Sequence, residues 1–377
     1  MKQKLRFRLD AASGYRRLVG IGGIGSGIFF ALDGNHTLGR DESRLGKLLD
    51  IRDYCKLHII SHYVAVLLGA APGGSFRVIP IGKVGDDAPG RQMIREMGAA
   101  GMDTDHVEPI DGAPTLFSVC FQYPDGTGGN LTTSNSAAAQ LGSDDLDKQE
   151  DLFAEPAIAL AAPEVPLAAR AHFLKMATQH RAFRAASFTA AEVAPAVELG
   201  MFANLDLVSI NEGEAAVLAG RAFAPADPMP FLQACEKTLT GSYPNLRLVI
   251  TAGKLGAFAF SQGAWDFCPA PKVQVASTAG AGDALLGGLI AATVAGLPFL
   301  RHAPSLSREE RPLTSALDFA VLLSSYTVTS PHTIHPHAEL ENLLAFASDL
   351  GLSLAPGISR LVEPRSGPPV KPESISA

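Results

Sequence analysis

The sequence predicts a three-layer α/β/α sandwich with a mostly parallel central sheet. From Leu152 onward, short apolar strand-like runs alternate with helical patterns. This order is typical of right-handed βαβ crossovers, which place helices on both faces of a parallel sheet. The composition agrees, because 377 residues with 47% hydrophobic and 18% charged residues can build a large core. The length alone would also allow two domains.

The expected elements follow from apolar periodicity and from the turn residues between the apolar runs. The expected strands are an apolar run within 17–28 that enters a glycine-rich turn, then Arg77–Ile81, Thr115–Tyr123, Asn130–Thr133, Ala157–Ala161, Leu205–Ile210, Leu246–Thr251 and Lys272–Val275. The expected helices are Tyr54–Leu68, Ala88–Met97, Leu167–His180, Glu212–Ala219, Pro230–Thr238 and Ala284–Leu300. Asp86 or Asp87 is the predicted N-cap of the second helix, since an Asp side chain can accept from free amides there. Residues 115–133 form a predicted β-hairpin around a Pro-Asp-Gly turn.

The two ends of the chain are expected to lie outside the folded domain, which we place at residues 17–354. Residues 1–16 are rich in Arg and Lys, and no apolar signal-peptide segment follows them, so we predict a solvated basic arm. From residue 355 the chain is rich in Pro and Ser and has few apolar residues. This composition predicts a flexible tail over residues 355–377.

Charge and cysteine content argue against several classes of function. The net charge of −7 argues against a nucleic-acid surface. The run Ala284–Leu300 is rich in Gly and Ala and lacks flanking aromatic anchors, so it is expected to be a core helix and not a membrane span. The four cysteines have no metal-binding spacing, which indicates reduced thiols of a cytoplasmic protein.

The segment Ser277–Gly288 carries the strongest functional signal, because a glycine-rich turn leads directly into a small-residue helix. Gly280 and Gly282 have no Cβ, so an anion can approach the backbone closely. The free amides and the positive dipole end of a helix N-terminus form an anion site. Asp283 adds a carboxylate beside it, and a base next to an anion site is what phosphoryl transfer to an alcohol requires. The alternative is a tightly packed strand-to-helix turn.

This segment resembles the D-T-x-G-A-G-D signature of the ribokinase-like (pfkB) carbohydrate kinases. Gly280, Ala281, Gly282 and Asp283 match G-A-G-D, while Ser277 replaces the leading Asp. The resemblance implies that Asp283 removes the proton from the acceptor hydroxyl. It also implies that the amides of the three preceding residues hold the transferring phosphate.

The same resemblance implies a ribokinase-like form of the sandwich, with a small β-lid over the site. We expect the lid to be formed by parts of residues 31–53 and by the hairpin within 115–133. The segment Gly82–Asp87 resembles the family's G-x-V-G-x-D sequence. We interpret it as mainly structural, a strand end and helix cap beside the acceptor pocket.

Asn211-Glu212-Gly213-Glu214 resembles the family's N-x-x-E motif, which follows a strand near the metal and the phosphates. The resemblance implies that Asn211 and Glu214 bind Mg²⁺ through water, since Mg²⁺ keeps much of its hydration shell. The alternative is helix capping, with Asn211 as N-cap and Glu214 as its capping-box partner. Both roles can hold at once.

Thr251, Gly253 and Gly256 match the family's T-x-G-x-x-G nucleotide loop, whose glycines leave room for the ribose and phosphates of ATP. ATP is therefore the expected phosphoryl donor. The alternative is a β-hairpin turn in which the two glycines only supply positive φ angles.

The N-terminal part departs from the family pattern. No carboxylate follows the first strand until Asp33, where the family usually has a sugar-binding Asp. Cys55–His62 stands in place of the family's G-G-x-x-x-N segment, and Val321 aligns with an Asn that often borders the adenine. The candidate acceptor-binding residues are Ser26, Asp33, Asn35 and His36.

These observations predict an ATP- and Mg²⁺-dependent kinase that phosphorylates a hydroxyl of a sugar or sugar-like small molecule. One alternative is a nucleoside kinase of the same fold, because the usual sugar-binding Asp is missing. Another is a non-catalytic descendant that keeps affinity for a nucleotide or phosphate. Because family members often pair through their lids, a homodimer is a further hypothesis.

Overall fold

The computed structural model describes residues 4–12, 14–125, 127–240, 242–307 and 312–365. The strands are β1 (Leu5–Phe7), β2 (Arg17–Ile21), β3 (Gly25–Leu32), β4 (Gly46–Tyr54), β5 (Arg77–Gly85), β6 (Val107–Ile110), β7 (Leu116–Gln122), β8 (Gly128–Thr132), β9 (Ala157–Ala161), β10 (Phe183–Ala186), β11 (Leu207–Asn211), β12 (Arg247–Thr251), β13 (Gly256–Ser261), β14 (Ala264–Pro269) and β15 (Val362–Pro364).

The α-helices are α1 (Lys56–Leu68), α2 (Ala88–Ala99), α3 (Ser143–Asp147), α4 (Leu167–Gln179), α5 (Ala190–Glu198), α6 (Glu212–Ala219), α7 (Met229–Thr240), α8 (Ala281–Val294), α9 (Ala316–Thr327), α10 (Leu340–Asp349) and α11 (Pro356–Arg360). Short 3₁₀ turns are η1 (Ala137–Gln140), η2 (Glu150–Phe153), η3 (Met201–Asn204) and η4 (Gly253–Leu255). Within the described residues, no helix is both long enough and apolar enough to cross a membrane.

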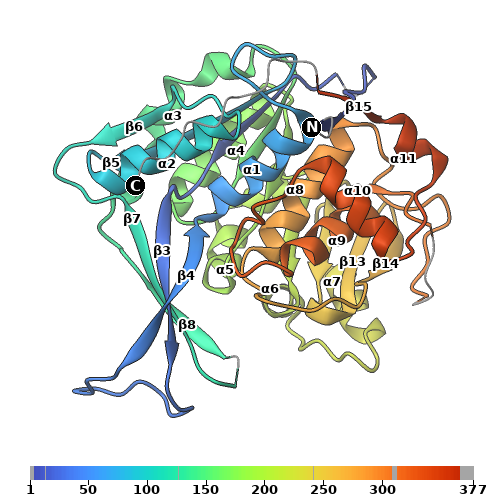
Figure 1. The fold of residues 1–377 in the computed structure, drawn as a ribbon. Coiled ribbons are helices and arrows are strands. Elements are labelled where there is room, and N and C mark those ends of the chain that lie inside the picture. The colour runs from blue at the N-terminus through green and yellow to red at the C-terminus, as the bar shows by residue number, and fades with distance from the viewer. Residues whose placement is uncertain (1–3, 13, 126, 241, 308–311, 366–377) are drawn as a thin grey trace.

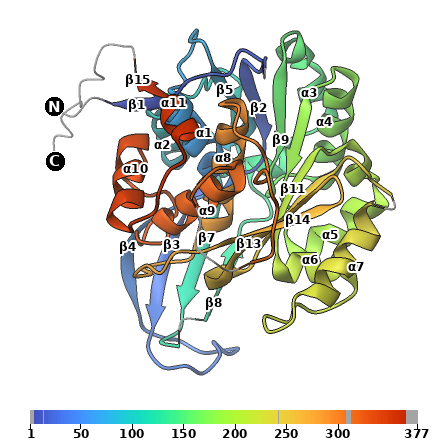
Figure 2. The ribbon, with the colours of Figure 1, turned by 90° about the vertical axis from the view of Figure 1, so that its right-hand side faces the viewer.

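A large sheet forms the centre of the molecule (Figures 1 and 2). Among the described residues it has nine strands, in the order β14-β13-β12-β11-β10-β9-β2-β5-β6. β13 pairs antiparallel with β12 and β14, and the other neighbours are parallel. Parallel neighbours bring their carboxyl ends to one edge, where ligands bind in open α/β sheets. The predicted sandwich with a mostly parallel sheet is confirmed.

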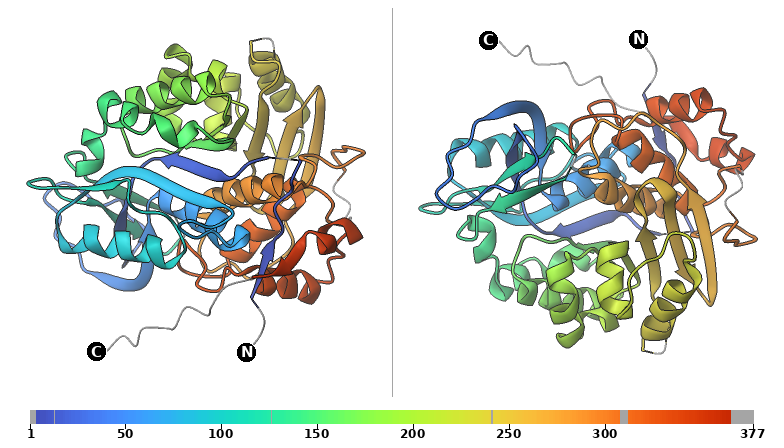
Figure 3. Two further views of the ribbon diagram at one scale, coloured as in Figure 1. Left: turned by 90° about the horizontal axis from the view of Figure 1, so that it is seen from above. Right: turned by 90° about the horizontal axis from the view of Figure 1, so that it is seen from below.

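Helices cover both faces of this sheet (Figure 3). One core packs the sheet against α1, α8, α9 and α10, and the other packs it against α4, α5 and α7. Leu18 of β2 belongs to the first core and its neighbour Val19 to the second, because successive strand side chains point to opposite faces. Both residues are fully buried, so this strand passes between the two helical layers.

Four strands form a second sheet that projects from the main sheet as a lid (Figure 1). Their order is β4-β3-β7-β8, and the predicted hairpin is present as β7 and β8. The run expected as one strand within 17–28 is divided between β2 of the main sheet and β3 of the lid. Gly25 permits this crossing, because a Cβ there would overlap the carbonyl group of Leu116.

The lid is attached to the main sheet through Asp87. As the N-cap of α2, Asp87 accepts from the amide of Gly90 at 2.8 Å through Oδ1. Its Oδ2 accepts from the amide of Thr115 at 2.9 Å, directly before β7. The Thr115 hydroxyl oxygen in turn accepts from the amide of Gly85 at 3.0 Å. One carboxylate therefore fixes a helix start, a strand end and the base of the lid.

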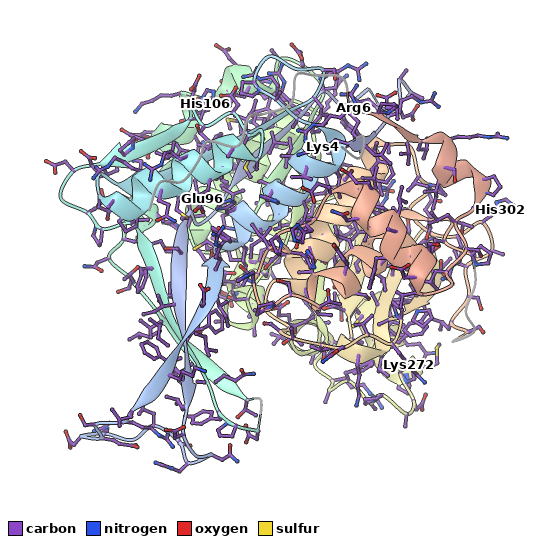
Figure 4. The ribbon with its side chains drawn as sticks, viewed as in Figure 1. Lys4, Arg6, Glu96, His106, Lys272 and His302 are labelled. Atoms are coloured by element: carbon purple, nitrogen blue, oxygen red, sulfur yellow. The ribbon has the colours of Figure 1, made fainter. Side chains whose placement is uncertain are left out.

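The two ends of the described chain pair with each other, so the prediction of a solvated arm and a flexible tail is wrong for residues 5–7 and 356–364. β1 and β15 form a two-stranded antiparallel sheet beside α11 (Figure 2). Arg6, labelled in Figure 4, forms an ion pair with Glu363 at 2.9 Å. Phe7 is fully buried in the first core, which periodicity could not reveal in so short a segment. Residues 1–3, 13 and 366–377 lie outside the described residues.

Phe7→Ala is expected to lower the free energy of unfolding by about 3–5 kcal/mol, the usual cost of removing a buried aromatic ring. The ring packs on Phe319, with centroids 4.8 Å apart. Urea denaturation measures the effect, and Arg8→Ala, at the exposed next residue, is the matched control with a change below about 0.5 kcal/mol. Equal stability of both variants would contradict the conclusion that the N-terminal segment belongs to the fold.

Candidate active site

Gly280 shapes the N-terminus of α8. It is the N-cap of this helix, with a φ of 79° in the left-handed region that favours glycine. A Cβ at Gly280 would also overlap the carbonyl oxygen of Thr333. The glycine therefore lets the chain turn sharply into α8 while it packs against the segment before α10.

The amides at this helix N-terminus are partly free. Among the described residues, the amides of Gly280 and Gly282 have no hydrogen-bond acceptor, whereas the Ala281 amide donates to the carbonyl of Thr278 at 3.3 Å. A Cβ built at Gly282 would meet no heavy atom within 4 Å, so open space lies beside this residue. Free amides next to open space at the positive end of a helix can bind an anion.

Asp283, in the first turn of α8, is paired with Lys56, the first residue of α1. Asp283 is only 8% exposed, and its Oδ2 lies 3.6 Å from Nζ of Lys56. Burial raises the pKa of Asp283, and the positive charge of Lys56 opposes this rise. The carboxylate of Asp283 in turn raises the pKa of Lys56, so the lysine stays charged. A buried carboxylate with raised proton affinity, held ionised by a neighbouring cation, is suited to act as a general base.

Two cavities meet at this pair. One of about 890 Å³, the lid cavity, lies between the lid sheet and the main sheet. The other, of about 1140 Å³, is the α8 cavity, bordered by the start of α8, α6 and the β12–β13 hairpin. The residues that line both cavities are Lys56, Thr278, Gly280 and Asp283. Two small ligands could therefore bring their reacting groups together beside Asp283.

The predicted nucleotide loop lines the α8 cavity. Thr251 ends β12, and Gly253 and Gly256 follow with φ angles of 52° and 120°. A Cβ at Gly256 would overlap the carbonyl oxygen of Cys268, so the backbone requires this glycine. A Cβ at Gly253 would meet nothing within 4 Å, so Gly253 borders open space. The two alternatives for this motif, hairpin turn and ligand loop, both fit the geometry.

Two lysines besides Lys56 line the α8 cavity. Lys254 lies in the β12–β13 turn and Lys272 follows β14, at the edge of the molecule in Figure 4. Val321 lines the same cavity, at the position expected to border an adenine. The expected strand Lys272–Val275 is wrong, because this segment pairs with no strand among the described residues and instead lines the cavity. The lysines supply positive charge that an anionic ligand needs.

Asn211 and Glu214 form a capping box at the start of α6. The Glu214 amide donates to Asn211 Oδ1 at 2.8 Å, and the Asn211 amide donates to Glu214 Oε2 at 2.8 Å. Both residues also line the α8 cavity, and burial raises the pKa of Glu214. Within the described residues, no group of three or more His, Cys, Asp or Glu could enclose a metal ion. One carboxylate and one amide beside an anion site nevertheless fit Mg²⁺, which is bound largely by water and phosphate oxygens.

The lid cavity is lined by acidic, polar and aromatic side chains from the lid and the main sheet. Glu164 follows β9, and its Oε2 accepts from the backbone amide of Lys56 at 3.0 Å, so it caps α1. Burial raises the pKa of Glu164 to about 7, against the opposing charge of Lys56. The lid contributes Phe29, Leu49, Asp53, Cys120, Phe121 and Asn130.

Comparison with known proteins agrees with this arrangement. The sequence matches the pfkB family carbohydrate kinase domain over residues 64–340. The chain belongs to the pfkB family of carbohydrate kinases. It is 27% identical to a ribokinase of Schizosaccharomyces pombe over 256 residues, which cover 67% of this chain and 74% of that protein. It is 22% identical to a deoxyribokinase of Salmonella typhi over 278 residues, covering 72% and 82%.

The structure of a ribokinase from Cryptococcus neoformans var. grubii serotype A in complex with ADP shares the fold. The TM-score is 0.67 at 21% identity, and the match covers 88% of this chain and 99% of that one. Carbohydrate kinases are phosphotransferases, so the predictions of the pfkB family, of the ribokinase-like fold and of the enzyme class are confirmed.

The structure does not bring the four predicted acceptor-binding residues of this pfkB chain to either cavity. Asp33, Asn35 and His36 lie in the loop between β3 and β4, at the end of the lid far from the main sheet (Figure 1). Arg44 organises this loop, donating to the carbonyl oxygens of Asp33 and His36. Ser26 lies on β3, but it too is absent from the cavity lining. The geometry therefore gives no support to the three loop residues as acceptor ligands, because their loop packs on itself and on the β7–β8 turn, where Asn35 Oδ1 accepts from the amide of Asp125 at 3.0 Å.

The sequence pattern does not mark Asp53, Lys56 or Glu164 as site residues of this pfkB chain. Asp53 and Lys56 stand within or beside the segment that departs from the family's G-G-x-x-x-N sequence. Glu164 follows the buried strand Ala157–Ala161 by three residues. A polar residue just after a parallel strand is the one signal that could have identified Glu164, since such ends border the ligand site.

Proposed function

We propose that this chain transfers the γ-phosphoryl group of ATP to a hydroxyl of a sugar, with Asp283 as the general base. The observation that supports this proposal is the position of the Asp283–Lys56 pair where the two cavities meet. ATP would occupy the α8 cavity, beside the glycine hairpin and the two lysines. The acceptor would occupy the lid cavity, with its reacting hydroxyl next to Asp283.

In the proposed reaction, the acceptor oxygen attacks the γ-phosphorus in line with the leaving oxygen. Asp283 takes the proton of the acceptor hydroxyl as its oxygen attacks the γ-phosphorus, and the bond from phosphorus to the β,γ-bridging oxygen breaks to release ADP. The free amides of Gly280 and Gly282 would stabilise charge on the transferring group. Lys56, which lines both cavities, would keep Asp283 ionised and attract the γ-phosphate. Mg²⁺, when bound, would neutralise phosphate charge, with its water ligands held by Asn211 and Glu214.

A nucleoside acceptor is the second candidate. Phe29 and Phe121 line the lid cavity, and an aromatic face is what a base would stack on. Turnover and thermal stabilisation with ATP, Mg²⁺ and D-ribose, D-fructose or adenosine would separate the two candidates. Stabilisation by ATP without turnover of any acceptor would instead support a non-catalytic nucleotide-binding protein.

A cytoplasmic location is part of the proposal. All four cysteines are free and buried in the described structure. Free thiols are the usual state in a reducing compartment.

Asp283→Asn is expected to lower kcat by about 10²–10⁴-fold, the usual contribution of acid–base catalysis. Because the amide is nearly isosteric and the proposed phosphate contacts are backbone amides, the affinity for ATP should be kept. Steady-state kinetics and ATP titration measure the two effects, with Asp111→Asn at an exposed loop as the matched control. Near-normal turnover of Asp283→Asn would contradict the proposed mechanism.

The pH profile provides a test of the role of Lys56. Asp283 must be ionised to accept a proton, so kcat should fall as the pH drops below its raised pKa. Lys56 opposes that rise, so Lys56→Met should shift the acid limb of the kcat profile to higher pH. The same variant should weaken ATP binding by removing a positive charge. An unchanged acid limb would show that Lys56 does not control the protonation of Asp283.

We also propose that two copies pair through their lids. Leu48 and Leu131 are 58% and 74% exposed, on lid strands whose neighbouring residues Leu49, Asn130 and Thr132 line the cavity. Alternation along a strand places the two leucines on the outer lid face.

Light scattering should therefore give the mass of a dimer for the wild-type protein. The double variant Leu48→Asp/Leu131→Asp should give the mass of a monomer, because burying two added charges is costly. A wild-type monomer at working concentration would contradict the dimer.

A further inference from the structure

Asp53 is a carboxylate of the lid that the mechanism above does not use. It is half-buried near the end of β4 and lines the lid cavity, as Lys56 and Asp283 also do. All three side chains border the same cavity, so Asp53 faces the space in which the acceptor would bind. By contrast, no carboxylate occurs between residues 17 and 32, along the first strand and the start of the lid.

The lid is built to accommodate this carboxylate. Asp53 pairs with Gly27 on β3, and a Cβ at Gly27 would overlap Oδ2 of Asp53. The thiol of Cys120, on the other neighbour of β3, donates to the same oxygen at 3.7 Å. Gly27 therefore leaves space for the side chain of Asp53, and the thiol of Cys120, a weak donor, binds one of the two carboxylate oxygens.

Asp53 has no ionic partner in the described structure. Lys56, the basic residue of this cavity, pairs with Asp283 at 3.6 Å. Burial raises the pKa of Asp53 to about 6, and the Cys120 thiol, the Tyr54 amide and the charge of Lys56 lower it only in part. A partly buried carboxylate without a cation is costly unless donors reach it. A ligand with hydroxyl groups would supply such donors from the cavity side.

The charge of the whole cavity favours an acceptor without a phosphate group. Its carboxylates are Asp50, Asp53, Glu164, Glu192 and Asp283. Lys56 is the one basic side chain among the described lining residues. A phosphomonoester would bring negative charge toward these groups with no free Arg or Lys to receive it.

We propose that Asp53 binds the hydroxyl groups of the acceptor from the lid, and that the lid cavity thereby selects uncharged acceptors over phosphorylated ones. The inference rests on the proposed phosphoryl transfer and assigns the recognition of its acceptor. Since Asp53 belongs to the lid, acceptor binding would also hold the lid sheet against the main sheet.

The test compares the wild-type protein, Asp53→Asn and the matched control Asp41→Asn. Asp41 carries the same charge in the exposed β3–β4 loop of the lid, and its φ of 57° is tolerated by Asn. Turnover is measured with D-ribose, D-fructose, adenosine, D-fructose 6-phosphate and D-ribose 5-phosphate. Circular dichroism and thermal unfolding establish that each variant is folded.

The wild-type protein should use an uncharged acceptor with a lower KM than either phosphorylated sugar. Asp53→Asn should raise the KM for that acceptor by about 10- to 100-fold, as expected for weakened hydrogen bonds to a charged group. Its KM for ATP and its kcat at saturating acceptor should change by less than about threefold. The lost hydrogen bonds stabilise the bound acceptor and the transition state equally, so their loss does not raise the barrier from the bound complex. Asp41→Asn should match the wild-type protein.

The alternative results separate the inference from the function on which it rests. A preference for a phosphorylated sugar, or an acceptor KM unchanged in Asp53→Asn, would overturn the inference while leaving phosphoryl transfer intact. A fall in kcat without a change in acceptor KM would show that Asp53 affects chemistry or structure and not acceptor binding. No transfer to any of the five acceptors would overturn the proposed function and this inference together.

Discussion

The pairing of the buried Asp283 with the partly exposed Lys56 is the constraint on which the site depends. Two helices from distant parts of the chain begin at this pair, since Lys56 starts α1 and Asp283 lies in the first turn of α8. Their N-termini concentrate partial positive charge, which favours anions, while burial penalises an isolated carboxylate. The positive charge of Lys56 offsets the cost of burying the Asp283 carboxylate, while that carboxylate still faces both cavities. An ionised base can therefore persist beside a place for phosphate.

The surrounding structure keeps this arrangement in position. Glu164 caps α1 through the amide of Lys56, so the lysine backbone is fixed before its side chain reaches Asp283. The left-handed conformation of Gly280 allows α8 to start where the two cavities meet. Tight packing of α1 and α8 within the same core then fixes the distance between the two charges. Helix packing, more than any single hydrogen bond, sets the geometry of the base.

The lid follows a different design from the main sheet. Its strands are half-exposed, and one face borders a cavity while the other carries exposed leucines. Its attachment through Asp87 and Thr115 combines a helix cap with a strand start, so the lid is joined to the main sheet by polar contacts. Apolar packing adds to these contacts, since Leu116 at the start of β7 belongs to the second core, and the amide of Tyr54 on β4 donates to the hydroxyl of Thr333 at 3.0 Å. The paired termini, by contrast, extend the first core through the burial of Phe7.

The sequence by itself determined the sandwich, the family and the order of the motifs around α8 and the β12–β13 hairpin. These features depend on local rules, because glycine conformation, helix N-termini and strand periodicity act within a few residues. Only the tertiary structure decided which side chains face the acceptor. Asp53 and Lys56 lie close together in the sequence, but Glu164 and Asp283 come from distant segments and reach them only through packing. The polar loop that holds Asp33 and His36 instead packs on itself and on the β7–β8 turn. The pairing of the two termini also depends on the tertiary structure, because a three-residue strand is too short to show a periodic pattern in the sequence.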